Sequence, residues 1–256
     1  SEIKSKNYPC IKICGFFNNK EKNKANLFRN IFANCVIGFV LIGLFALTYA
    51  GGILNVTSSS QEEAIYQGNT ESNNICLMIN VYWGNEYIPK MLETLEENDV
   101  KTTFFIGGSW AEDYPEILKE IYDGGHEIAN HAYSHPDLKE KSLETNKTEI
   151  SKTTDIIKEL LNVEMTLFAP PSGSYSETTL QVAKELGYTT IMWTRDTIDW
   201  RDQDRELIYS RAVKNAAGGD LILMHPTKET ANALPDIIKT LKDQGFNLTT
   251  VSETIA

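Results

Sequence analysis

Short apolar runs alternate with helical patterns through residues 75–256 of the sequence. Each run is bounded by Gly, Pro, Asn or Asp and is rich in β-branched or aromatic residues, which is the pattern of buried strands. The runs predict strands over 75–81, Thr102–Gly107, Glu127–Asn130, Thr166–Ala169, Thr189–Thr194, Leu221–His225 and Asn247–Val251.

Between these runs, apolar residues recur every three or four positions, as on one face of a helix. The pattern predicts helices over Tyr87–Asn98, Tyr114–Tyr122, Glu144–Leu161, Ser176–Leu186, Arg205–Ala217 and Glu229–Gln244. Strands that alternate with helices form a parallel sheet with the helices outside it. An open doubly wound sheet lacks support, because no Gly-rich phosphate loop follows any strand. A closed or nearly closed (β/α) barrel is therefore favoured.

A long apolar segment precedes the strands. Ile31–Leu54 contains no charged residue, and about 20 apolar residues suffice to cross a bilayer as a helix. A buried helix of a soluble protein would show a polar stripe, which this segment lacks. A signal peptide cleaved after Thr48-Tyr49-Ala50 is the competing interpretation. The apolar run is longer than that of most signal peptides, which favours an uncleaved anchor.

Charge is distributed unevenly around this segment. The formal net charge is −11, yet residues 1–30 carry seven Lys and Arg against two Glu. The positive-inside rule then predicts a basic cytoplasmic tail over 1–30, a transmembrane signal-anchor over 31–54 and an exported remainder. The polar residues 55–74 are typical of a linker, and 75–256 form the folded domain. Because the exported part is acidic, it would repel a phosphate backbone, which excludes nucleic acid as a partner.

Two histidines follow the third predicted strand. His131 and His135 are four residues apart near the carboxyl end of that strand, where barrels of this kind place their sites. This spacing brings two imidazoles onto one ion and favours a metal pair over two unrelated surface residues.

Other chemistry-bearing residues follow the fifth and sixth strands. Asp196 and Asp199 lie beside Trp200, either as a helix cap and a solvated charge or as groups that hold a catalytic residue. His225 ends the sixth strand, either as a structural hydrogen-bonding group or as a general acid or base. His126 begins its strand, at the opposite end of the barrel, and is interpreted as structural.

Five segments together resemble one known family. TTFFIGGSW, GGHEIANHAYSHPDL, PPSGSYSETTL, DTIDW and LILMHP are similar, in order and spacing, to the polysaccharide deacetylases with the NodB homology domain. The resemblance covers about residues 75–252, and INVYWGNEY is most similar to a sporulation-associated, membrane-anchored branch. It implies a deformed (β/α)7 barrel outside the cell membrane. It also implies that the partner is a cell-wall glycan with N-acetylated sugars.

The resemblance further implies roles for individual residues. In this family a divalent metal, zinc or similar, is held by an Asp and two His and activates water; an Asp is the base and a distal His the acid. His131 and His135 match the metal histidines. His225 matches the acid, and Asp199 matches the carboxylate that orients it.

Substrate-binding residues follow in the same way. Trp200 and Leu223 match the apolar wall against the acetyl methyl group. Trp83, Tyr133 and Tyr175 are further aromatic candidates for stacking on sugar rings.

Three positions depart from the family pattern. The base Asp is replaced by Asn80, the metal-ligand Asp by Val81, and the Arg that holds the base by Ala169. An amide cannot accept the proton of water, and loss of a general base typically costs about 10²–10⁴ in rate. Ala169 agrees with Asn80, because a buried Arg without its carboxylate would be an unpaired charge. With two imidazoles and at best an amide oxygen, we expect weak or absent metal binding.

Three functions remain open on this basis. The first is a membrane-anchored, extracytoplasmic deacetylase-like protein that is catalytically impaired by Asn80 and still binds cell-wall glycan. The second is an active deacetylase with an altered mechanism, using metal hydroxide or Tyr82 as the base. The third is a structural scaffold of the envelope that retains only the fold. The retained His131, Asp199 and His225 argue against the scaffold, which has no need of them.

Overall fold

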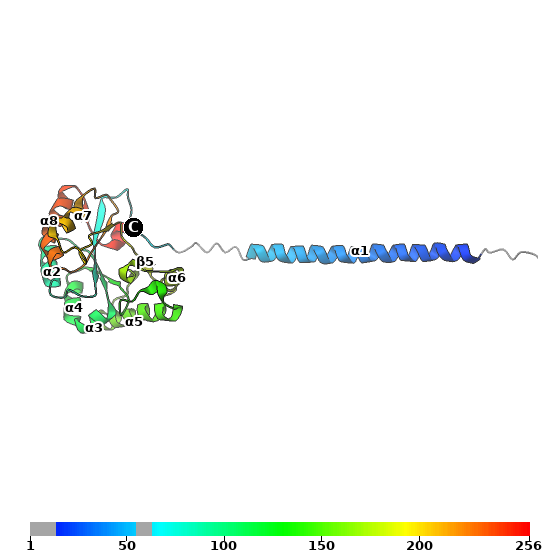
Figure 1. Ribbon diagram of the computed structural model, residues 1–256, viewed down its shortest axis with the longest axis horizontal. Coiled ribbons are helices and arrows are strands. Elements are labelled where there is room, and N and C mark those ends of the chain that lie inside the picture. Colours follow the sequence, from blue (N-terminus) through cyan, green and yellow to red (C-terminus); the bar gives the residue numbers. More distant parts are fainter. Residues whose placement is uncertain (1–13, 55–62) are drawn as a thin grey trace, which may run out of the picture. The chain divides into compact units, whose positions relative to one another are not determined.

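The computed structural model describes residues 14–54 and 63–256, and the chain divides into two units, Ser1–Ser60 and Gln61–Ala256 (Figure 1). In the first unit a single helix is described, α1 (Cys14–Leu54). Its segment Asn26–Ala46 is long and apolar enough to cross a membrane, and a signal sequence near an N-terminus has the same properties.

Parts of the predicted tail, anchor and linker lie within the described residues. The predicted anchor 31–54 lies within α1, which begins before it, so residues 14–30 of the predicted tail are helical. Residues 1–13 of that tail and 55–62 of the predicted linker lie outside the described residues.

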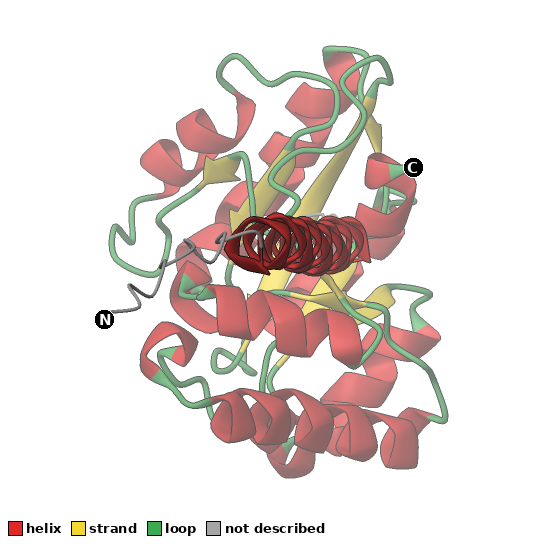
Figure 2. Ribbon diagram, turned by 90° about the vertical axis from the view of Figure 1, so that its right-hand side faces the viewer, coloured by secondary structure: helices red, strands yellow, loops and turns green. Residues whose placement is uncertain are grey.

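The second unit is built on a parallel sheet whose strands lie at its centre with helices around them (Figure 2). The strand order is β5-β4-β3-β2-β1-β7-β6, and β8 pairs with β1. The sheet curls into a half-barrel, so the predicted α/β class and deformed barrel are confirmed. The strands are β1 (Asn74–Val81), β2 (Thr103–Ile106), β3 (Glu127–Asn130), β4 (Leu167–Phe168), β5 (Thr189–Thr190), β6 (Arg195–Asp196), β7 (Leu221–Met224) and β8 (Asn247–Leu248).

The helices around the sheet follow the predicted ones closely, except that two short helices were not predicted. Those two are α3 (Gly108–Asp113) and α9 (Val251–Ile255). The others are α2 (Ile88–Glu97), α4 (Pro115–Asp123), α5 (Leu143–Leu161), α6 (Glu177–Glu185), α7 (Arg205–Val213) and α8 (Lys228–Asp243), with 3₁₀ turns at Leu138–Glu140 and Pro171–Gly173.

Several predicted strands are longer than the observed ones, and two of them differ most. The strand over Thr189–Thr194 ends after two residues. The N–H of Ile191 still donates to the carbonyl of Phe168, and an isolated bridge joins Ile191 to Ile65. The strand over Asn247–Val251 also ends after two residues. There Thr250 caps α9, and its side chain and that of Glu253 form a reciprocal capping box.

Side chains of β1 alternate between two cores, as the period of a strand requires. One core lies between the sheet and the helices, and the other fills the inside of the curled sheet. The first receives Ile75, Leu77, Ile79 and Val81, and the second receives Cys76 and Met78. Asn80 continues the inner set at the carboxyl end of the strand. Both cores draw only on residues of the second unit, so residues 61–256 contain the core that a separate domain needs.

His126 lies at the opposite end of the sheet from that carboxyl end. The imidazole is buried, and its Nδ1 accepts a hydrogen bond from the backbone N–H of Thr102 at 3.3 Å. Burial, and to a smaller degree the charge of Lys101, lowers the pKa of His126 to about 4. This geometry agrees with the structural interpretation of His126.

The lowered pKa of His126 predicts a loss of stability in acid. The unfolded chain takes up this proton near pH 6.5 and the folded chain only near pH 4, so the stability is present above pH 6.5 and is lost as the pH falls toward 4. Between pH 7 and 4.5 we expect the native 61–256 fragment to lose about 2 kcal/mol more free energy of unfolding than His126→Asn, which cannot be protonated. Urea unfolding at a series of pH values measures the difference. Parallel curves for the two proteins would contradict the prediction.

Candidate functional site

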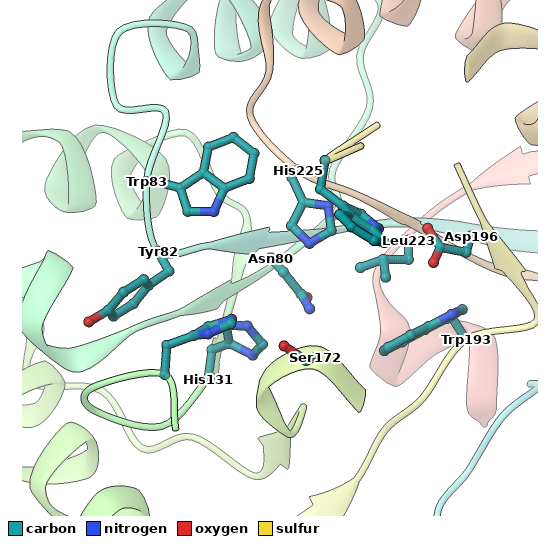
Figure 3. A pocket seen from close by; sticks show the side chains of 11 residues that line it. Asn80, Tyr82, Trp83, His131, Ser172, Trp193, Asp196, Leu223 and His225 are labelled. Carbon is teal, nitrogen blue, oxygen red and sulfur yellow. The ribbon is translucent and has the colours of Figure 1, made fainter. Parts of the chain in front are cut away.

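A pocket of about 380 Å³ opens at the carboxyl ends of the strands (Figure 3). Barrels of parallel strands place their sites at this end, because loops from several strands converge there. The pocket is lined by Asn80, Tyr82, Trp83, His131, His135, Ser172, Trp193, Asp196, Trp200, Leu223 and His225. Most of the predicted site residues therefore lie together.

Asn80 lies in the middle of this group, with His131 and Ser172 on one side and Trp83 and His225 on the other (Figure 3). Its side chain is 4% exposed, and its Oδ1 accepts no hydrogen bond from the residues that the structure describes. Buried amide oxygens are nearly always paired. Asn80 thus presents an unsatisfied acceptor to whatever enters the pocket.

The two predicted metal histidines are neighbours, with ring centroids 5.2 Å apart. Nδ1 of His131 lies 2.8 Å from the carbonyl oxygen of Ala169. Because a carbonyl oxygen only accepts, this nitrogen carries the proton and Nε2 keeps its lone pair. Burial lowers the pKa of His131 to about 3 and also lowers the pKa of His135. Both rings are therefore neutral at pH 7, as metal ligands must be.

The third metal ligand of the family pattern is missing from the pocket. Val81 packs in the outer core beneath the helices, on the opposite face of β1 from Asn80. Within residues 14–54 and 63–256, no three His, Cys, Asp or Glu side chains gather as a metal site would require. Two imidazoles and the amide oxygen of Asn80 are neutral donors. They do not fit the Asp-His-His set that holds a divalent ion in the family.

His225 is held by a buried carboxylate. Its Nδ1 lies 2.8 Å from Oδ1 of Asp199, and its backbone N–H donates to Oδ2 at 2.6 Å. The hydroxyl of Thr230 also donates to Oδ2, at 2.6 Å. Because the carboxylate accepts, Nδ1 carries the proton and Nε2 is left for the pocket. This arrangement suits an oriented acid or base.

Aromatic side chains surround the pocket. The indole of Trp83 stacks on the imidazole of His225, with centroids 5.7 Å apart and planes 9° from parallel. Trp83 is 41% exposed and Trp200 52% exposed, so both present faces to a ligand, while Leu223 is buried in the wall. Tyr82 packs its ring against His135 at 4.9 Å.

Two aromatic candidates lie outside this pocket. Tyr133 does not line the pocket: its hydroxyl donates to Glu112 at 2.8 Å, and the ammonium of Lys152 lies 3.3 Å from its ring centroid. The hydroxyl of Tyr175 lies 2.8 Å from that of Tyr66, also outside the pocket.

Two lining residues, Trp193 and Ser172, are not among the predicted site residues, and a third, Asp196, is predicted without a definite role. Trp193 was placed inside a strand that in fact ends before it. Ser172 lies in a 3₁₀ turn with φ of 55°. This left-handed conformation is not predicted by the sequence pattern. Asp196 was noted as a carboxylate without a definite role, and its place at the end of β6 brings it to the pocket. The Asp-x-x-Asp-Trp spacing was the signal for this last residue.

Comparison with known sequences gives several relatives. Residues 67–191 match the polysaccharide deacetylase family. The chain is 40% identical over 195 residues to the protein YlxY of Bacillus subtilis, covering 76% of this chain and 61% of that protein's length. It is 32% identical over 196 residues to the peptidoglycan-N-acetylmuramic acid deacetylase PdaA of Bacillus subtilis, covering 75% of this chain and 74% of PdaA.

Among solved structures, BA3943 of Bacillus anthracis, described as a CE4 family pseudoenzyme, matches with a TM-score of 0.74 and 37% identity. The match covers 76% of this chain and 69% of that one. A mutant of BA3943 described as having restored enzymatic activity also matches with a TM-score of 0.74, at 36% identity and with 76% and 72% of the two chains covered.

The hydrogen bonds around Asp199 predict a graded loss of stability. In Asp199→Asn, an NH₂ group that cannot accept a hydrogen bond replaces one of the two carboxylate oxygens that face the three donors. We expect this substitution to lower the free energy of unfolding by about 3–5 kcal/mol. Thr230→Val removes one donor and should cost about 1.5–3 kcal/mol. Urea unfolding of the 61–256 fragment measures both. Equal losses in the two variants would show that the network does not converge on the carboxylate.

Proposed function

The chain belongs to the polysaccharide deacetylase family, and on that premise we propose that it is a membrane-anchored protein that binds cell-wall glycan in a catalytically impaired deacetylase pocket. One observation carries the proposal. Asn80 occupies the position of the catalytic base, and it lies in the pocket beside His131 and His225. Its amide cannot take a proton from water, whereas the rest of the pocket retains the form of a binding site.

The residue at position 169 also suits a pocket without the catalytic base. Ala169 is fully buried in the inner core, where Met78 is also buried. An Arg at position 169 would need the space that this apolar core fills, and it would find no carboxylate at Asn80 to pair with. Asn80 and Ala169 are therefore compatible with each other. Either family residue alone, the Asp at position 80 or the Arg at position 169, would lack its charged partner.

The relatives support both halves of the proposal. PdaA is named as a deacetylase of peptidoglycan, which points to an N-acetylated cell-wall glycan as the ligand. BA3943 is described as a pseudoenzyme, and one of its mutants as having restored activity. The present chain has the same fold with 37% identity to BA3943.

The aromatic residues of the pocket suit a sugar ring. Trp83, Trp193 and Trp200 supply flat apolar faces, and the neighbouring polar groups accept or donate hydrogen bonds. A pyranose has both an apolar face of C–H groups and a rim of hydroxyls, so it matches a wall of this composition.

Location follows from α1. Its apolar segment suits a single span of the cell membrane, and the Lys and Arg residues that precede it favour an N-terminus in the cytoplasm. Residues 61–256 then lie outside the membrane, next to the wall glycan.

An active deacetylase with an altered mechanism is the second candidate. The retained pair of Asp199 and His225 favours it, since an oriented acid is of use in cleaving an amide. The two candidates differ in the rate of acetate release by the native chain.

Restoring the family residues tests the proposal. A variant carrying Asn80→Asp, Val81→Asp and Ala169→Arg, with Met78→Thr to make room for the Arg, should release acetate from N-acetylated chito-oligosaccharides in the presence of Zn²⁺. We expect a rate at least about 10²-fold above that of the native chain, because a base has returned to the pocket. Acetate release by the 61–256 fragment is the measurement.

The control for this variant adds His225→Ala, which should return acetate release to the native level. Because Val81 lies in the outer core, a parallel variant omits Val81→Asp and so avoids a buried carboxylate there. A native chain as fast as the restored ones would overturn the proposal and establish the altered mechanism instead.

Glycan binding should depend on the exposed indoles. We expect Trp83→Ala and Trp200→Ala each to weaken binding of a chito-oligosaccharide by about 3–10-fold, since each removes a stacking face. Tyr122→Ala is the matched control, because Tyr122 is 40% exposed and lies outside the pocket. Isothermal titration calorimetry measures the three constants. Equal affinity in all of them would remove the indoles from the binding surface.

A further inference from the structure

We propose that the pocket prefers a de-N-acetylated amino sugar, whose C2 ammonium pairs with the carboxylate of Asp196. This inference rests on the proposed function and specifies the ligand: a glycan residue with a free amine instead of an N-acetyl group. The ligand is then the product of amide hydrolysis by another enzyme.

The charges that line the pocket are of one sign. Among the residues that line the pocket, Asp196 alone carries a carboxylate, and none is Lys or Arg. The remaining titratable side chains are three imidazoles and the Tyr82 phenol. Burial lowers the pKa values of His131 and His135, so these two rings carry no charge at pH 7. A pocket of this kind attracts a cation and repels a carboxylate-bearing sugar.

Asp196 is held in place with one oxygen left over. Its Oδ1 accepts a hydrogen bond from the backbone N–H of Ile198 at 2.7 Å. No residue that the structure describes donates to its Oδ2. The side chain lies on the same side of the pocket as Trp193 and Leu223 (Figure 3). Because the carboxylate is already oriented, little side-chain entropy is lost when a cation binds to it.

The nearby guanidinium groups are engaged elsewhere. Arg195 donates to the backbone carbonyls of Arg211 and Asn215 and lies 3.5 Å from the carboxylate of Asp220. Arg201 makes a two-point contact with Asp202, at 2.8 and 2.9 Å. Neither guanidinium donates a hydrogen bond to Asp196, although the pKa of Arg201, which Asp202 raises most, is also raised by the charge of Asp196. The Oδ2 of Asp196 therefore stays available to a ligand.

A second, independent observation also points to a ligand rich in donors. The Oδ1 of Asn80 is buried in the pocket without a donor. Oδ2 of Asp196 is another acceptor that receives no hydrogen bond from the residues that the structure describes. An ammonium offers three N–H donors and no acceptor, whereas an acetamide offers one donor and adds a carbonyl acceptor. The unsatisfied acceptors of the pocket therefore suit the free amine better.

Calorimetry with two trisaccharides tests the preference. The 61–256 fragment is titrated at pH 6.5 and low salt with the β-1,4-linked trisaccharide of glucosamine and with that of N-acetylglucosamine. We expect the glucosamine form to bind about tenfold more tightly, and 0.5 M NaCl to reduce this ratio severalfold. In Asp196→Asn, which keeps an acceptor for the Ile198 N–H, the ratio should fall to about one.

The matched control is Asp123→Asn, an exposed carboxylate on α4 that pairs with Lys119 and lies outside the pocket; it should keep the preference. If Asp196→Asn does not fold by circular dichroism, Asp196→Ser replaces it. Equal or tighter binding of the acetylated form by the native fragment would overturn this inference and leave the proposed function standing. A preference that survives the loss of Asp196 would also overturn it. Failure of both sugars to bind would overturn the inference and the proposed function together.

Discussion

Burial of β1 on both of its faces is the constraint on which the rest of the second unit depends. The strand pairs with β2 on one side and with β7 on the other, and β8 also pairs with it. Its side chains alternate strictly between the two cores, so the register of one strand decides what enters the pocket. Asn80 faces the pocket and Val81 faces the helices for this reason alone. A shift of one residue would exchange them.

The replacements relative to the family pattern are coherent in charge. Asn80, Val81 and Ala169 together remove two carboxylates and one guanidinium, so no ion is left buried without its partner. Asp199 keeps its three donors, and His225 keeps its orientation. Under the proposed function, the pocket lacks the groups that activate water and keeps a wall that suits a sugar. Such a combination is expected where binding is retained and turnover is not.

What remains in the pocket has a definite electrostatic character. The pocket contains the acceptor Oδ1 of Asn80, which is buried without a donor, and the carboxylate of Asp196, which is oriented by the N–H of Ile198. In an active relative, a divalent ion held by carboxylate and imidazoles adds positive charge at this place. Under the further inference, the cavity without that ion and without the family's Arg favours a cationic ligand, because Asp196 remains as a lining carboxylate. The proposed preference would make this a deacetylase-type pocket that selects the product of deacetylation.

The sequence by itself determined the elements whose signal is long or local: the apolar helix α1, the six longer amphipathic helices, and strands such as β3, whose bounds were predicted without error. It also placed the pairs His131–His135 and Asp199–His225 at the strand ends, because all parallel strands end at one edge of the sheet. Only the tertiary structure decided that Trp193 lines the pocket, that Tyr133 binds Glu112 instead, and that β5 stops where Ile65 pairs. These outcomes depend on partners far away in the sequence. Periodicity reports which side of an element is buried, whereas the direction of a loop side chain is set by the groups that pack against it.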